Sequence, residues 1–186
     1  QGSVPFSRPE SLLKDADRRV LVDETTTFPN SAICLLDLKY PDDKNYSGTG
    51  VLIGPHMLLT CAHNVQDKSG QRPQKINIYP GQNGNAAPFG CASATHIFVK
   101  NDYGSSANRH TDADPGDLAV ILLDRNMGDE TGWVGIKPWP NGKGAPVELN
   151  ITGYPGRRGH QMMMVGEGED FMGGLIAHKI DTEPGQ

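Results

Sequence analysis

The sequence has no hydrophobic run long enough to cross a membrane. Its apolar stretches, such as residues 32–36, have the length of a single strand, whereas a membrane-spanning helix needs about 20 consecutive apolar residues. We therefore expect no membrane partner for this chain.

The sequence also has no excess of basic residues. Its 17 Lys and Arg are outnumbered by 22 Asp and Glu, which gives a formal net charge of -5. Binding to nucleic acid or to an anionic lipid surface needs clustered cations that neutralise phosphates. We therefore expect no nucleic acid partner.

Cysteine is scarce, because Cys34, Cys61 and Cys91 are the only three in the chain. At most one internal disulfide can form among them. Cys34 and Cys61 are the favoured pair, since both lie in segments that lead to the same histidine loop. The alternative, three thiols that pack as small hydrophobic side chains, stays open.

The sequence lacks a recognisable metal motif as well. The cysteine spacing matches no zinc pattern. His110, Asp112 and Asp114 alternate within one segment, but acids beside Pro and Gly are typical of solvated turns. We expect no metal and no cofactor.

Turn-forming residues, in contrast, are abundant. The 23 Gly and 14 Pro separate short apolar segments, a pattern that favours many short strands over long helices. The sequence thus predicts an all-β fold, in which six strands close a first antiparallel barrel. These candidate strands span residues 31–38, 50–53, 57–60, 75–79, 95–99 and 118–123.

A smaller set of strands follows at residues 147–152, 162–165 and 175–180. Three strands cannot close a barrel, and they leave an unpaired edge that natural proteins avoid. We therefore expect a second six-stranded barrel that is incomplete in this chain. The predicted organisation is an N-terminal arm at 1–28 with one helical turn at 10–16, a first barrel at 29–124, a linker at 125–144 and a partial second barrel at 145–186.

One histidine and one aspartate stand where strands of the first barrel begin or end. His63 follows the candidate strand 57–60, and Asp117 directly precedes the strand 118–123. A histidine can accept a hydroxyl proton and return it near neutral pH, provided that a carboxylate on its far ring nitrogen holds one tautomer. The sequence therefore predicts His63 and Asp117 as a catalytic pair.

The motifs around these residues resemble those of the trypsin-like serine proteases, and within them the glutamyl endopeptidase branch. The likeness covers nearly the whole chain from Arg18 onward. It rests on five segments in the family's order, GTGVLI at 48–53, LTCAHNV at 59–65, GDLAV at 116–120, ITGYPG at 151–156 and IDTEPGQ at 180–186.

The resemblance implies a chymotrypsin-like fold of two barrels and further site residues. Gly185 is similar to the residue whose backbone N–H forms half of the oxyanion hole. Thr182 is similar to a threonine that lines the primary specificity pocket of the branch. The family continues from such a segment into the nucleophilic serine, so we expect that serine directly after Gln186.

The function predicted from these features is a secreted serine endopeptidase with a preference for Glu or Asp before the cleaved bond. Gln1 is not a methionine, and we expect that a leader has been removed. The expected partners are a peptide or protein substrate and the remaining C-terminal segment, in the same chain or a separate one. Two alternatives stay open, an inactive pseudoprotease or binding module with the same fold and a protease with cysteine as its nucleophile.

Overall fold

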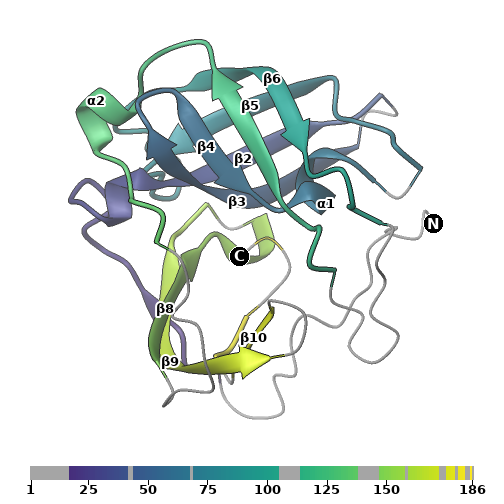
Figure 1. Ribbon diagram of the computed structural model, residues 1–186. Coiled ribbons are helices and arrows are strands. Elements are labelled where there is room, and N and C mark those ends of the chain that lie inside the picture. The colour runs from purple at the N-terminus through teal and green to yellow at the C-terminus, as the bar shows by residue number, and fades with distance from the viewer. Residues whose placement is uncertain are drawn as a thin grey trace.

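The computed structural model describes residues 17–41, 44–67, 69–104, 114–137, 147–157, 159–171, 175–178, 180–182 and 185. A closed barrel lies at the top of Figure 1, and a smaller sheet lies below it. The expected helical turn at 10–16 lies outside the described residues. No helix among the described residues has the length and apolar character that a membrane crossing requires.

Six antiparallel strands form the barrel, as the sequence predicts. Along the closed sheet the strands follow the order β2-β3-β4-β7-β6-β5. Each of the six covers most or all of a predicted segment, and β3 begins earlier than expected. Their bounds are β2 Ile33–Lys39, β3 Asn45–Gly54, β4 Met57–Thr60, β5 Lys75–Pro80, β6 Ala92–Val99 and β7 Ala119–Leu123.

Alternating burial explains why these segments pair as strands around one core. Every second residue of β2 is buried, as expected for a strand with one face toward a core. Leu36, Leu58, Ile78 and Ile121 come from four different strands and are fully buried in a single cluster. The barrel is therefore a packed core that holds the strand ends at fixed positions.

The smaller sheet is built around one long strand. β9 (Met162–Phe171) pairs along one edge with β8 (Val147–Gly153), and along the other edge with β1 (Val20–Leu21) and β10 (Leu175–His178). The described residues thus contain one closed barrel and a four-stranded sheet. Of the two predicted barrels, only the first is present as a closed barrel in this part of the chain.

The sequence did not predict β1 or the four short helices. A strand of two residues carries almost no periodic signal, and β1 forms because β9 offers it a partner. The helices are η1 (Asn30–Ala32), α1 (Ala62–Val65), α2 (Gly128–Thr131) and η2 (Pro155–Arg157). Of these, α1 contains His63, at the place where the sequence analysis expected a loop.

A buried polar network joins the sheet to the barrel. Gln161 Nε2 donates to the hydroxyl of Tyr154 at 2.8 Å, and that hydroxyl donates to the backbone oxygen of Gln82 at 3.1 Å. Burial raises the pKa of the Tyr154 hydroxyl, so this group remains a neutral donor. Because unmet polar groups are costly inside a protein, the network fixes the start of β9 against the barrel.

The three cysteines, all within the described residues, form no disulfide. The predicted pair of Cys34 and Cys61 is therefore wrong. Cys34 lies inside the barrel core, where burial raises the pKa of its thiol, whereas Cys61 follows the end of β4 and is exposed. The barrel wall that separates the two environments explains why they do not join.

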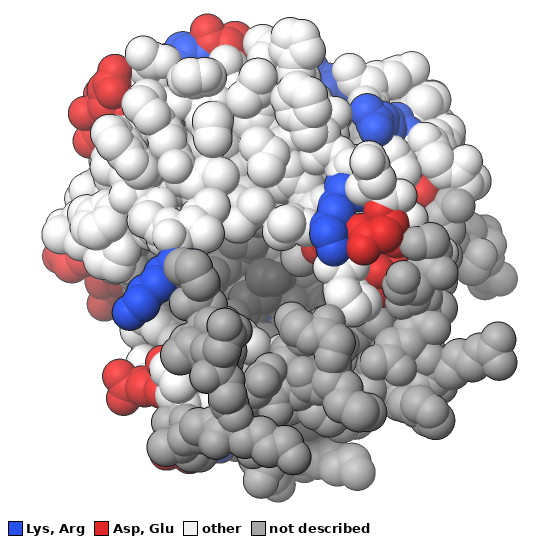
Figure 2. Space-filling view, viewed as in Figure 1, with Lys and Arg blue, Asp and Glu red and all other residues white. Residues whose placement is uncertain are grey.

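The charged side chains on the face shown in Figure 2 are scattered, and some Lys and Arg have acids beside them. The described residues of this face form no basic patch, in agreement with the charge balance of the sequence.

We predict that Leu36→Ala destabilises the barrel by about 2 to 5 kcal/mol, because the lost methyl groups leave a cavity in a packed core. Urea unfolding measures this change. Ile136→Ala serves as the control, since Ile136 is 72% exposed and its truncation should change stability by less than about 0.5 kcal/mol. Equal effects of the two substitutions would contradict this description of the core.

Candidate active site

His63 is held at the mouth of the barrel by the helix that contains it. β4 ends at Thr60, and α1 begins at Ala62, which is fully buried together with Val65. These two apolar side chains anchor the helix in the core. The ring of His63, between them in sequence, keeps 28% of its side chain exposed.

Asp117 is positioned by a tight turn just before β7. The Asp114 carboxylate accepts hydrogen bonds from the backbone N–H groups of Gly104 at 2.7 Å and Gly116 at 2.8 Å. A Cβ on Gly116 would lie 2.8 Å from backbone atoms of Asp102 and Tyr103, so only glycine allows the two loops to pack so closely. Asp114 therefore has a structural role in this turn, while His110 and Asp112 lie outside the described residues.

The Asp117 carboxylate holds His63 at two points. His63 Nδ1 lies 2.6 Å from Asp117 Oδ2, and the backbone N–H of His63 donates to Oδ1 at 2.8 Å. A carboxylate in this position favours the tautomer with the proton on Nδ1. Nε2 is then the nitrogen with a lone pair, so the ring can act as a base on its outer side.

Gly185 lies between the barrel and the loop that follows β8. Its φ is +98°, and a Cβ would approach the backbone oxygen of Tyr154 at 3.0 Å, so this position requires glycine. The Thr49 hydroxyl donates to the Gly185 oxygen and accepts from the Tyr154 N–H at 2.9 Å. Thr49 thus links the predicted oxyanion residue to β3 of the barrel.

The same threonine is connected to the histidine loop. The Thr60 hydroxyl donates to the Thr49 oxygen at 2.7 Å and accepts from Asn64 Nδ2 at 2.9 Å. Asn64 is the residue after His63. A chain of hydrogen bonds therefore runs from Gly185 to the neighbour of His63. Sequence reasoning did not identify it, because the motifs that contain the two threonines do not show that their hydroxyl groups meet in the fold.

Thr182 follows an acid that is paired with the N-terminal segment. Asp181 accepts hydrogen bonds from the Arg18 backbone N–H and Nε at 3.1 Å and from Nη2 at 3.0 Å. These bonds lower the pKa of the Asp181 carboxyl. The ion pair therefore ties the residue before Thr182 to the segment that leads into β1, a link that spans 163 positions and left no signal in the sequence.

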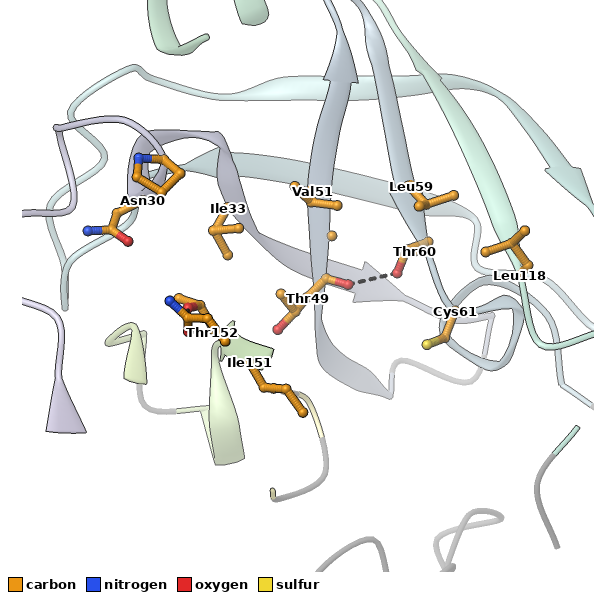
Figure 3. A pocket seen from close by; sticks show the side chains of 13 residues that line it. Asn30, Ile33, Thr49, Val51, Leu59, Thr60, Cys61, Leu118, Ile151 and Thr152 are labelled. Carbon is orange, nitrogen blue, oxygen red and sulfur yellow. Dashed lines mark hydrogen bonds between the residues drawn. The ribbon is translucent and has the colours of Figure 1, made fainter. Parts of the chain in front are cut away.

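A cavity of about 520 Å³ opens between the barrel wall and β8. Thr49 and Cys61 line it from the barrel, and Ile151 and Thr152 face them from β8 (Figure 3). Its walls combine apolar side chains with a few hydroxyl groups and one thiol. This side of the barrel is therefore hollowed next to the segment that carries His63.

Cys61 brings a third reactive group to the pair. Its sulfur, a ring nitrogen of His63 and a carboxylate oxygen of Asp117 all lie within 4.8 Å of one another. From the sequence we predicted only a disulfide or a packing role for this thiol, because the spacing of these three residues matches no motif.

Comparison with known proteins identifies relatives that are peptidases. No family model matches the chain. A Glu endopeptidase solved in complex with MPD is 30% identical to it, with a TM-score of 0.77, and the match covers 91% of this chain and 76% of that one. The protease Anisep from Arthrobacter nicotinovorans, 16% identical with a TM-score of 0.64 over 81% of this chain and 68% of its own, supports the fold alone.

Two curated Bacillus proteins match over most of this chain. An extracellular metalloprotease of Bacillus subtilis is 29% identical over 82% of the chain and 47% of its own length. A glutamyl endopeptidase of Bacillus licheniformis is 28% identical over 76% of the chain and 41% of its own length. The chain thus spans less than half the length of these curated relatives. Together with the barrel and the similarity to the solved Glu endopeptidase, these matches show that the chain belongs to the trypsin-like serine proteases of chymotrypsin fold, in the glutamyl endopeptidase branch.

Proposed function

We propose that the protein containing this chain is a secreted serine endopeptidase in which His63 is the general base and Asp117 orients it. The observation that carries this proposal is the 2.6 Å contact between His63 Nδ1 and Asp117 Oδ2. Secretion is supported by a relative that is named as extracellular.

The proposed nucleophile is a serine that directly follows Gln186. The resemblance of residues 180–186 to the family's segment before its serine supports this position. The segment that begins with this serine would add strands to the sheet around β9. In this way it would complete a second barrel.

The proposed reaction passes through an acyl-enzyme. His63 Nε2 takes the serine proton as the serine oxygen bonds to the peptide carbonyl carbon. The imidazolium then gives this proton to the leaving amine as the C–N bond breaks. A water molecule repeats the sequence and releases the acid, again with His63 as base, while Asp117 stabilises the charged ring at each step.

Gly185 is the proposed donor to the oxyanion. During attack, negative charge develops on the carbonyl oxygen, and a backbone N–H fixed in advance stabilises it. Thr49 supports this role, because it holds the Gly185 oxygen and so limits how the peptide plane can turn. The N–H of the serine itself would be the second donor.

A preference for Glu at the cleaved bond is supported by the relatives named glutamyl endopeptidases. In this proposal, the Thr182 hydroxyl donates to the substrate carboxylate. Asp181, the residue before it, would repel that carboxylate if its charge were unpaired. Arg18 offsets this charge with three hydrogen bonds, which makes the neighbourhood of Thr182 compatible with an acidic side chain.

A metal-dependent peptidase is a second candidate. The relative from Bacillus subtilis is named a metalloprotease, and Cys61, His63 and Asp117 bring three potential ligands together. In that reading the metal would activate water, and no serine would be needed.

One experiment separates these functions. With the complete protein, we expect a fluorophosphonate probe to label a serine, and a Glu-containing peptide to be cut equally well before and after treatment with EDTA. Loss of cutting in EDTA without serine labelling would support the metal-dependent reaction instead. If the probe labels no serine and the peptide is not cut, the protein is a pseudoprotease.

We predict that Asp117→Asn lowers kcat on the order of 10⁴-fold, because an amide favours the wrong tautomer of His63. Steady-state peptide hydrolysis measures the change, and circular dichroism checks the fold. Asp124→Asn is the matched control, since Asp124 Oδ1 accepts a backbone N–H at 2.9 Å and an amide oxygen preserves that bond. Similar kinetics for the two variants would contradict the proposed role of Asp117.

We predict that Arg18→Ala lowers the ratio of kcat/KM for Glu over Gln substrates on the order of fivefold, because the charge of Asp181 is then no longer offset and repels the substrate carboxylate. Asp181→Asn in the same variant should restore the ratio. Arg125→Ala is the control, because Arg125 also pairs with an acid, Glu130, at 3.5 Å. A ratio unchanged in Arg18→Ala would show that Asp181 does not act on the substrate charge.

The same ion pair gives a pH dependence of known sign. The hydrogen bonds from Arg18 lower the pKa of the Asp181 carboxyl in the folded protein. The ion pair therefore stabilises the folded protein fully above the ordinary carboxyl pKa. This stabilisation is lost as the pH falls through the lowered pKa.

A further inference from the structure

We propose that Cys61, His63 and Asp117 form an inhibitory binding site for Zn²⁺ or another thiophilic divalent cation. Among the described residues this is the one group of at least three His, Cys, Asp or Glu side chains whose donor atoms all lie within 4.8 Å of one another. The inhibitory part rests on the proposed function of His63, whereas the binding part depends on the ligand geometry alone.

The donor set fits zinc. A thiolate sulfur, an imidazole nitrogen and a carboxylate oxygen are the ligands that Zn²⁺ takes in proteins, at about 2.0 to 2.3 Å. Tetrahedral angles at these bond lengths put the ligand atoms about 3.3 to 3.6 Å apart. From the present limit of 4.8 Å, the sulfur therefore has to approach its partners by little more than about 1 Å. His63 Nδ1 and Asp117 Oδ2, which are 2.6 Å apart, have to separate by about 0.7 Å to admit the cation.

The residue that can supply this movement is Cys61. It lies between the end of β4 and the start of α1, and its side chain is exposed. Rotation about one side-chain bond moves its sulfur without displacing either element. His63 and Asp117 are joined by two hydrogen bonds. The bond to the backbone N–H can remain, and the bond to Nδ1 gives way to the cation.

A cation can reach the site from the cavity between the barrel and β8. Cys61 lines this cavity, and Figure 3 shows its sulfur on the side of the open space. Three protein ligands leave a fourth position for water, which is the usual composition of an accessible zinc site.

Occupation of the site removes the base. The cation binds His63 Nδ1, because Asp117 faces that nitrogen, and it replaces the proton that Asp117 receives. The remaining ring proton is then on Nε2, which has no lone pair left to take the serine proton. Proton transfer stops, so the bound cation acts as an inhibitor and not as a cofactor.

The binding test uses Co²⁺ as a spectroscopic probe for Zn²⁺. Titration of the chain should give a cobalt–thiolate charge-transfer band that saturates at one ion per chain and that Zn²⁺ displaces. Cys61→Ser should abolish the band. Cys91→Ser should leave the band intact, because this half-buried thiol lies in the connection between β5 and β6, directly before β6.

The activity test uses the complete protein. Zn²⁺ should inhibit peptide hydrolysis, and Cys61→Ser should need at least tenfold more Zn²⁺ for the same inhibition while Cys91→Ser behaves as the unmodified protein. A protein that shows the band but cuts no peptide under any condition would overturn the proposed function and keep the site. Absence of the band, or a band that survives Cys61→Ser, would overturn the site itself.

Discussion

The Asp117 carboxylate, shared between the ring and the backbone of His63, is the interaction on which the whole site depends. One oxygen receives the Nδ1 proton and the other receives the backbone N–H of the same residue. Because the backbone contact holds the carboxylate in place, the ring cannot turn without loss of its bond to Oδ2. Asp117 therefore sets the position and the tautomer of the His63 ring together, before any substrate is bound.

The barrel brings Asp117 and His63 together from segments 54 positions apart. β4 and β7 are neighbours in the closed sheet, so the end of one strand lies beside the beginning of the other. The hydrogen bonds from Thr60 through Thr49 to Gly185 attach the proposed oxyanion residue to the same barrel. Rigid strands thus carry groups that the loops alone could not hold in register.

Much of this could be predicted from the sequence, and the reasons are local. The barrel strands were predictable because short apolar segments between turn residues have few other ways to bury their side chains, and the pair of His63 and Asp117 followed from their places at strand ends. What could not be predicted depends on long-range contacts. β1 forms only by pairing with β9, and Arg18 pairs with the distant Asp181. Cys61 becomes a potential metal ligand only when folding brings His63 and Asp117 beside it. The error over Cys34 and Cys61 has the same origin, since proximity in sequence did not reveal that one thiol faces the core and the other the solvent.

The most direct test of the account is the tautomer of the His63 ring, observed by nitrogen-15 NMR at a pH where the ring is neutral, with the signal assigned from a His63→Gln spectrum. We expect a proton on Nδ1, shifted far downfield by its short hydrogen bond, and no proton on Nε2. A proton on Nε2 with a bare Nδ1 would contradict it, because the ring would then have no lone pair on the side where it must act.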